Sequence, residues 1–364
     1  MPTLAADALE RLAFATMSAL GSAAEEAGIV ARHLALANLS GHDSHGVGML
    51  PDYVRMAQAG LIVPNRELVT LVDFGALLLF DAGRGVGQRM IEAATHACIA
   101  RARTQGACVF GVRNAGHIGR VGHYAEQCAA AGMTSIFFVN VADHQPHQAP
   151  YGCSDARLGT NPFACAIPGK DGSGTDGPAA VLDMATSTIA FGKARVARNK
   201  GVPVPADSVI DEAGRPTTDP TALVDERKGA LKAFGQHKGS GLAVFCELLG
   251  AALTGGQTIQ PAHPVEGGIL NSVLGIVIDT ARMGEPDTIA HEVEAVKAWI
   301  KASKPAPGID RVRIPGEPEL EHRAERRRTG VPLDAKSLDD ILAAASAAGV
   351  PATLLDEIRA ASKG

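Results

Sequence analysis

The sequence predicts a mixed α/β protein, in which helices from both ends of the chain flank a body built on a β-sheet. Apolar residues follow helical spacing over the first forty residues, and again after a proline-rich stretch at residues 305–318. Between these regions, short apolar segments alternate with helical ones. We therefore expect a helical domain made of residues 1–70 and 305–364, and an α/β domain made of residues 71–304.

The N-terminal region reads as two helices. The first covers residues 5–20 and stops at Gly21. The segment Ser22-Ala23-Ala24-Glu25 has the spacing of a capping box, in which Ser and Glu side chains bind two free amides at the start of a helix. That second helix runs to about Leu39, and Gly41 is placed to end it in a left-handed conformation.

The middle of the chain supplies the sheet and its covering helices. We expect strands at residues 77–81, 107–112, 134–141, 163–167, 179–184 and 273–279. We expect helices at residues 90–104, 121–131, 240–254 and 289–302, and in the tail at residues 318–328, 335–348 and 352–362.

Composition limits the classes of partner. The chain has 364 residues and a net charge of −5, which leaves no broad basic field for nucleic acid or an anionic membrane. No apolar run reaches the roughly 18 residues that span a bilayer. The start of the chain has no leader pattern, and none of the six cysteines forms a Cys-x-x-Cys pair. We expect a cytoplasmic protein with free thiols.

One basic cluster occurs at residues 323–328, interleaved with Glu319, Glu321 and Glu325. Alternating charge of this kind is typical of an exposed helix face rather than a nucleic-acid site.

A glycine-rich segment after the first expected strand resembles a dinucleotide fingerprint but departs from it. Gly83, Gly85 and Gly87 precede a helix, whereas the fingerprint requires a glycine where Gln88 stands. A plain turn before a helix explains the segment better. Any nucleotide is therefore expected to bind outside a standard Rossmann unit.

The segment Gly41-His42-Asp43-Ser44-His45-Gly46 concentrates reactive side chains between two helical regions. Histidine suits proton transfer to a carbonyl oxygen, because its pKa lies near working pH. A neighbouring Ser or Asp can fix its tautomer. A helix-ending loop with a surface histidine fits the composition equally well.

Metal binding is a weaker hypothesis. His144 and His147 form a His-x-x-His pair across a proline, with His117 and His123 upstream. No set of Cys and His has structural-zinc spacing, and no His-Glu-x-x-His occurs. We expect no metal.

Four loops rich in Gly, Thr, Asn and Ser follow expected strands or open expected helices. They cover residues 114–120, 159–162, 183–187 and 236–241. Amides at helix starts can bind anions, an acid at a strand end can bind ribose hydroxyls, and Lys238 adds charge for a phosphate. Each loop is a weak signal, but together they suggest a cofactor held by scattered loops.

With these segments in order along nearly the whole chain, the sequence resembles the malate/L-lactate dehydrogenase family of the non-Rossmann type, and within it the hydroxycarboxylate dehydrogenases. Ureidoglycolate and sulfolactate dehydrogenases, diketogulonate reductase and piperideine-2-carboxylate reductase are other members. The matching segments are residues 41–51, 117–122, 125–132, 159–163, 183–187 and 201–205.

The resemblance implies a mixed-sheet NAD(P) domain beside the helical domain, a homodimer, and NAD or NADP as cofactor. It implies His45 as proton donor and acceptor, oriented by Ser44, although His117 is named as the base in some members. Thr160 would face the substrate. Residues expected to contact the cofactor are His117, Ile118, Gly119, Arg120, Val121, Asp183, Met184, Ala185, Thr186, Ser187, Lys238, Gly239, Pro315, Gly316 and Glu317.

Three departures from relatives bear on the substrate. Many members carry an Arg at the position of Met49, where it grips the substrate carboxylate, and we expect Arg120 to replace it. Lys193 stands where imine-reducing members have an Asp that completes a relay, which favours C=O over C=N chemistry. It fits a solvated helix lysine equally well.

The third departure is His144, His147 and Gln148, which fill a stretch that is mostly apolar in relatives. They are expected to line the substrate pocket or a subunit contact.

The predicted function is hydride transfer between a nicotinamide and C2 of a small 2-hydroxy or 2-oxo acid. Alternatives are a cyclic imino acid reductase, a metal-dependent lyase or hydrolase using His42, His45, His144 and His147, and a non-catalytic NAD(P)-binding protein.

Overall fold

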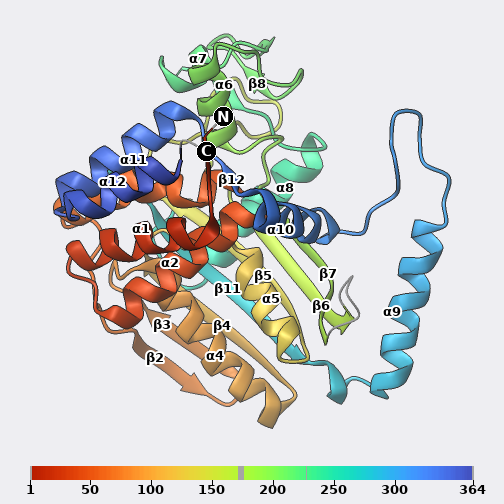
Figure 1. Ribbon diagram of the computed structural model, residues 1–364. Coiled ribbons are helices and arrows are strands. Elements are labelled where there is room, and N and C mark those ends of the chain that lie inside the picture. Colours follow the sequence, from red (N-terminus) through yellow and green to blue (C-terminus); the bar gives the residue numbers. More distant parts are fainter. Residues whose placement is uncertain (1, 171–175, 227, 363–364) are drawn as a thin grey trace.

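A computed structural model describes residues 2–170, 176–226 and 228–362. A seven-stranded sheet forms the lower body in Figure 1, and helices from both ends of the chain pack above it. The mixed α/β class predicted from the sequence is confirmed.

The helices are α1 (Ala6–Ala19), α2 (Ala24–Leu39), α3 (Leu50–Gln58), α4 (Gly87–Gln105), α5 (Gly122–Ala130), α6 (Phe191–Lys200), α7 (Thr221–Val224), α8 (His237–Glu247), α9 (Pro286–Lys301), α10 (Glu317–Thr329), α11 (Ala335–Ala348) and α12 (Ala352–Ala361). The strands are β1 (Thr3–Leu4), β2 (Val69–Phe74), β3 (Leu77–Asp81), β4 (Ala107–Ala115), β5 (Met133–Ala142), β6 (Phe163–Lys170), β7 (Asp176–Met184), β8 (Val209–Ile210), β9 (Pro216–Thr217), β10 (Ala230–Leu231), β11 (Leu270–Asp279) and β12 (Val331–Pro332).

The large sheet has the strand order β2-β3-β4-β11-β5-β6-β7. Its one parallel pair among the described strands is β3 with β4, which α4 connects, and every other neighbouring pair is antiparallel. A doubly wound nucleotide fold needs a mostly parallel sheet. This chain therefore has a single parallel crossover inserted in an antiparallel sheet, as the imperfect glycine fingerprint indicated.

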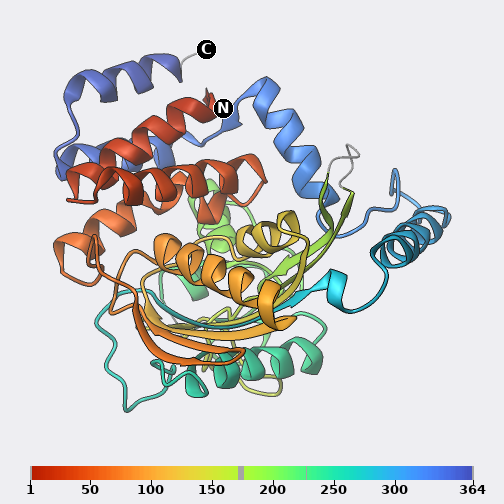
Figure 2. The same cartoon turned by 90° about the horizontal axis from the view of Figure 1, so that it is seen from below.

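Helices cover both faces of the sheet. In Figure 2, α4 and α5 lie on one face and α8 lies on the other. The core between the sheet and α4 and α5 includes Phe110, Phe137 and Tyr124, all fully buried.

The second hydrophobic core joins the two ends of the chain. Leu9 and Leu34 from α1 and α2 pack in one cluster with Ile341 and Leu342 from α11. Strand β1 pairs with β12, which ties residue 4 to residue 331. We keep the division into residues 1–70 with 305–364 and residues 71–304 as a proposal.

The start of α2 corrects one prediction. Ser22 does not cap the helix; its hydroxyl donates to Glu26 Oε1 at 2.7 Å, and Ala23 is the N-cap residue. Glu26 takes this bond because it is buried and also accepts from Arg89 and from the backbone of Asn65. The predicted capping box with Glu25 is therefore wrong.

The end of α2 matches the prediction. Gly41 has φ 83°, and two bonds close the helix, from Gly41 N to Asn38 O and from His42 N to Ala37 O. This is a Schellman ending. It turns the chain sharply into the loop of residues 41–46, the histidine loop.

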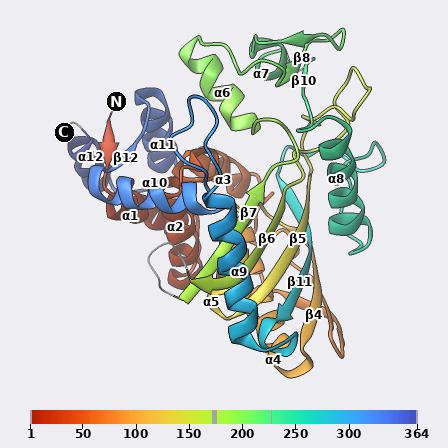
Figure 3. The same cartoon turned by 90° about the vertical axis from the view of Figure 1, so that its right-hand side faces the viewer.

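A small lobe made of α6, α7 and β8 to β10 was not predicted from the sequence, and it stands above the body in Figure 1 and Figure 3. Helix α9 matches the helix expected at residues 289–302, but its position was not predicted. It stands away from the body in Figure 1 and Figure 2, with Trp299 82% exposed. Within the described residues, no helix combines the length and apolar character that crossing a bilayer requires.

Candidate active site

The histidine loop is held from inside by Asn38, a buried residue near the end of α2. Its side chain accepts from Val47 N at 2.8 Å and donates to Asp43 Oδ1 at 2.8 Å. A Cβ atom at Gly46 would lie 2.1 Å from Asn38 Oδ1, so only glycine fits there. The loop therefore closes tightly around one buried amide.

Helix α10, from the other end of the chain, clamps the same loop from outside. Arg326 donates to both carboxylate oxygens of Asp43, at 2.7 and 3.1 Å. Glu319 lies 3.1 Å from Nε2 of His42. Because Arg323 and Arg326 both face inward, the prediction of a wholly exposed basic face was wrong for these two arginines.

The clamp presents Ser44 and His45 as a pair. The Ser44 hydroxyl lies 3.0 Å from Nδ1 of His45. The N-terminal end of α6 packs closely here, since a Cβ at Gly192 would lie 2.7 Å from Cβ of Ser44. Lys193 follows Gly192 in the sequence and is exposed.

His117 follows β4 and brings a second imidazole to the site. Its ring stacks on that of His45, with centroids 5.7 Å apart and planes 18° from parallel. Burial lowers the pKa of His45 to about 4, with His42 and Arg120 adding to the shift and Asp183 opposing it. Burial, His45 and His144 lower the pKa of His117 to about 3. Both rings are therefore neutral near pH 7.

Two residues behind His117 were missed in the sequence. The Tyr53 hydroxyl lies 2.8 Å from Nδ1 of His117, and Gln88 Nε2 donates to that hydroxyl at 2.6 Å. Gln88 was noticed only because it broke the glycine fingerprint. Tyr53 is a buried residue of α3, and no signal in the sequence marked it.

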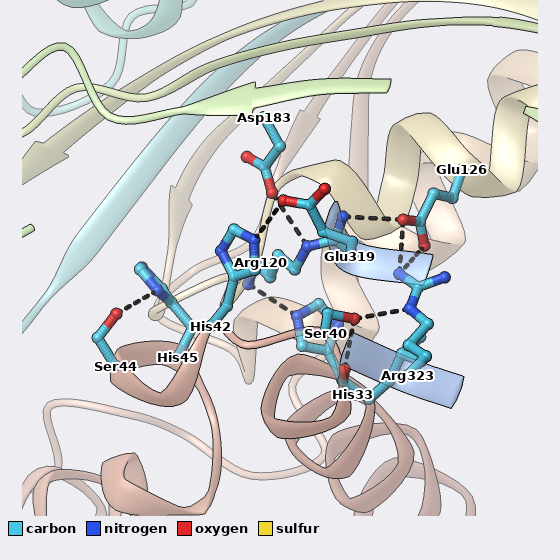
Figure 4. A network of polar contacts seen from close by, with 11 residues as sticks. His33, Ser40, His42, Ser44, His45, Arg120, Glu126, Asp183, Glu319 and Arg323 are labelled. Atoms are coloured by element: carbon cyan, nitrogen blue, oxygen red, sulfur yellow. Dashed lines mark hydrogen bonds and ion pairs between the residues drawn. The ribbon is translucent and has the colours of Figure 1, made fainter. Parts of the chain in front are cut away.

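Arg120 lies at the centre of an ion-pair network (Figure 4). Its Nη2 donates to Glu126 Oε1 at 2.8 Å, and its Nε lies 3.1 Å from Asp183 Oδ2. Burial alone would lower the pKa of Arg120, but Glu126 and Asp183 outweigh it and raise the pKa. Arg323 on α10 also binds Glu126, through Nη2 at 2.6 and 2.8 Å.

This network weakens the prediction that Arg120 binds the substrate carboxylate. Arg120 and Arg323 face three carboxylates, those of Glu126, Asp183 and Glu319. A further carboxylate would enter a cluster that already carries more acidic than basic groups. The charge that Arg120 offers to a substrate is therefore largely offset.

The segments expected to bind the cofactor converge on Asp183, at the end of β7. Arg120 contacts its carboxylate, and a Cβ at Gly122 would lie 2.5 Å from its Oδ2. Pro315 O accepts from Val181 N at 2.9 Å, two residues before Asp183. Phe234 N, four residues before Lys238, donates to Thr186 O.

Two observations fit a nicotinamide dinucleotide at this convergence. Nη1 of Arg120 is buried and makes no hydrogen bond to any described residue, and Oδ2 of Asp183 has the ion pair with Arg120 Nε but no well-aligned hydrogen bond from a described residue. A bound ribose or amide has the donors and acceptors that such buried groups need. The residues present therefore fit the cofactor.

Of the other predicted substrate residues, His144 lies near His117 and His147 stacks on His144. His144 and His147 stack with centroids 4.6 Å apart, and His147 stacks on Phe191 of α6 at 4.1 Å. His144 is near enough to His117 to lower its pKa. Thr160 O accepts two bonds from Thr186, which ties the turn expected to face the substrate to a segment expected to bind the cofactor.

Met49 points elsewhere. It is buried in the second core and cannot serve as a carboxylate ligand. Among the residues that the structure describes, no group of three or more His, Cys, Asp or Glu side chains is arranged to hold a metal ion.

Known proteins resemble this chain along its length. The malate/L-lactate dehydrogenase family matches residues 4–342. Hydroxycarboxylate dehydrogenase B of Escherichia coli K12 is 43% identical over 91% of this chain and 90% of its own. An L-lactate dehydrogenase of Cupriavidus necator is 40% identical, covering 82% and 85%. An E. coli structure, solved as a candidate malate/lactate dehydrogenase, superposes with a TM-score of 0.93 at 40% identity, covering 100% of both chains.

The depressed pKa of His117 predicts an acid-sensitive fold. An unfolded histidine titrates near 6.5 and the buried one near 3, so between these values only the unfolded chain gains the proton. The stability is fully present above pH 6.5 and declines as the pH falls toward 3. From about pH 7.5 to about pH 5, wild type should lose about 2 kcal/mol more unfolding free energy than His117→Asn in urea titrations. Equal losses in the two proteins would contradict this assignment.

Proposed function

Since the chain belongs to the malate/L-lactate dehydrogenase family, we propose that Ser44 and His45 carry the proton transfer of its reaction. The protein is a nicotinamide-dependent 2-hydroxyacid dehydrogenase, which interconverts a small 2-hydroxy acid and the 2-oxo acid. When bound, the cofactor supplies or accepts the hydride at C2. The observation that supports the proposal most is the neutral His45, held by Ser44 beside a second neutral imidazole.

His45 works through its Nε2 atom. We assign the hydrogen of the neutral His45 to Nδ1, which then donates to the Ser44 hydroxyl 3.0 Å away. The lone pair then lies at Nε2 and can accept the hydroxyl proton during oxidation. The same nitrogen returns a proton to the carbonyl oxygen during reduction. The low pKa of His45 makes it ready as a base. A substrate carboxylate beside the ring would favour its charged form when it must act as an acid.

The cofactor-binding residues that we propose belong to the segments that meet at Asp183. We propose that its carboxylate binds ribose hydroxyls, and the ion pair with Arg120 supports a fixed position for it. We propose that the other contacts come from residues 117–121, residues 184–187, Lys238 with Gly239, and Pro315 to Glu317. Asp183 is paired with an arginine, so it is not a free acid that would select NAD over NADP.

The substrate residues that we propose are Thr160, His144 and His147. We also propose a role for Lys193, which follows the residue packed against Ser44. His144, which stacks on His147, is near enough to His117 to lower its pKa, and Thr160 is hydrogen-bonded to Thr186. Arg120 stays a predicted carboxylate ligand, but its surroundings favour a first role in positioning Asp183.

The assembly that we propose is a cytoplasmic homodimer. Exposed apolar side chains on β2 and α9, including Phe74 and Trp299, support a subunit contact. Reduction of a cyclic imino acid is a minor alternative, because the similar curated relatives are dehydrogenases of hydroxy acids.

Removing the proton carrier should stop turnover without releasing the cofactor. His45→Ala should lower kcat by roughly 10²–10⁴, with the Kd for NADH or NADPH unchanged within about threefold. Initial rates on a 2-oxo acid panel and fluorescence titration measure the two effects. His96→Ala, on the exposed face of α4, is the matched control. A near-wild-type kcat in His45→Ala refutes the assignment.

Arg120→Ala separates the two roles of the arginine. If Arg120 positions Asp183, the KM for the cofactor should rise about tenfold while the KM for the 2-oxo acid changes little. Loss of a buried pair also destabilises the fold by about 3–5 kcal/mol, so a melting curve must first show that the variant is folded. Arg101→Ala, which loses a half-exposed pair with Asp73, controls for charge. A larger rise in the KM for the 2-oxo acid would restore the carboxylate role.

A further inference from the structure

Gln88 and Tyr53 form a buried hydrogen-bonded chain that ends on His117. Gln88 is 1% exposed, Tyr53 2% and His117 9%. They come from α4, α3 and the loop after β4, so three separate elements converge on one ring nitrogen. Buried polar chains of this kind persist only where each member is satisfied.

The direction of the chain follows from counting protons. Gln88 Nε2 donates to the Tyr53 oxygen at 2.6 Å, so that oxygen already acts as an acceptor. Burial raises the pKa of Tyr53, and the hydroxyl keeps its single proton. That proton points to Nδ1 of His117, 2.8 Å away. Nδ1 is therefore an acceptor, and the hydrogen of the neutral ring lies on Nε2.

Nε2 is also the atom left for the reaction. Nδ1 is engaged by Tyr53, which leaves Nε2 as the ring nitrogen available to a substrate. The ring plane lies 18° from that of His45, with centroids 5.7 Å apart, and Asp183, the carboxylate that acts on His45, is paired with Arg120. The groups that face His117 are the imidazoles of His45 and His144, and neither supplies a negative charge that would favour its protonation.

We propose that His117 is a fixed hydrogen-bond donor to the C2 oxygen of the substrate and takes no proton from it, and that Tyr53 and Gln88 are the positioning residues that enforce this. The proposal rests on the proposed function, which places the substrate oxygen beside His45. A neutral N–H aimed at an oxygen that gains negative charge stabilises the transition state, as an oxyanion hole does. The two histidines then divide the work, His45 moving the proton and His117 polarising the C–O bond.

The hydrogen position can be observed without any turnover. Two-bond ¹⁵N–¹H correlation spectra of ¹⁵N-histidine-labelled full-length protein distinguish the tautomers, with the His117 signals assigned from the His117→Gln spectrum. At about pH 8, the proposal expects the hydrogen on Nε2 and an unprotonated Nδ1. A hydrogen on Nδ1 overturns it, and that result would leave the role of His45 intact.

Two substitutions test the chemical role. The glutamine in His117→Gln offers an amide N–H near the place of Nε2 but cannot move a proton, and His117→Ala offers nothing. We expect His117→Ala to lower kcat by about 10²–10³, and His117→Gln to recover at least about tenfold of that loss with the pH–rate profile unshifted. An equal fall in kcat in the two variants would overturn the donor role. So would the disappearance of one titration from the pH–rate profile of His117→Gln.

The positioning residues need a readout that folding alone does not change. Gln88→Leu removes the donor, so the Tyr53 proton is no longer directed at His117. We expect kcat to fall about tenfold with the KM for the cofactor unchanged, and signals of the Nδ1–H tautomer to appear. Unchanged kcat and tautomer overturn the role of Gln88, as does a fall in kcat that only tracks the folded fraction. Tyr124→Phe, which loses an equally buried hydroxyl bond to Ile118 O, is the matched control for the tautomer.

Discussion

The contact between α10 and the rest of the protein is the interaction on which the site depends. One face of this helix carries Glu319, Arg323 and Arg326, which bind His42, Glu126 and Asp43 respectively. Through these pairs the core made from the chain ends is joined to the sheet domain at the loop of residues 41–46. Such pairs are costly to bury, so their value lies in geometry as much as in stability. They hold Ser44 and His45 in place before any substrate arrives.

The second constraint is desolvation. His45 and His117 lie together in a site that penalises charge, and both are neutral near pH 7. Neutral imidazoles can act either as a base or as a donor, and their hydrogen-bond partners decide which. In the tautomers that we propose, Nδ1 of His45 donates to Ser44 and its Nε2 is free to accept, whereas Tyr53 and Gln88 leave Nε2 of His117 with the hydrogen. Two similar rings thereby acquire different roles.

Local patterns in the sequence predicted the fold well, because periodicity and turn residues act over short distances. Gly41 ended its helix as expected, and the strand at residues 77–81 has the predicted bounds. The predictions that failed concerned side chains whose contacts depend on residues distant in the sequence. Ser22 bonded Glu26, which sits in a buried network, and Arg323 turned inward to Glu126. The contacts of Gln88 and Tyr53 with His117 join three elements that are far apart in the chain, so no local pattern predicts them. The lobe around α6 consists mostly of segments that are too short to have a recognisable hydrophobic periodicity. The positions of Ser44 and His45 were predictable from their motif, whereas the charges around Arg120 were not.

The central claim is that His45 is the proton carrier, and chemical rescue tests it most directly. A cavity left by His45→Ala can admit free imidazole, which then supplies the missing acid and base. The account predicts that imidazole restores turnover of the His45→Ala enzyme with saturation, and that it does not restore the His117→Ala enzyme, because a mobile imidazole lacks the fixed orientation that Tyr53 imposes. Rescue of His117→Ala with none for His45→Ala would contradict the account.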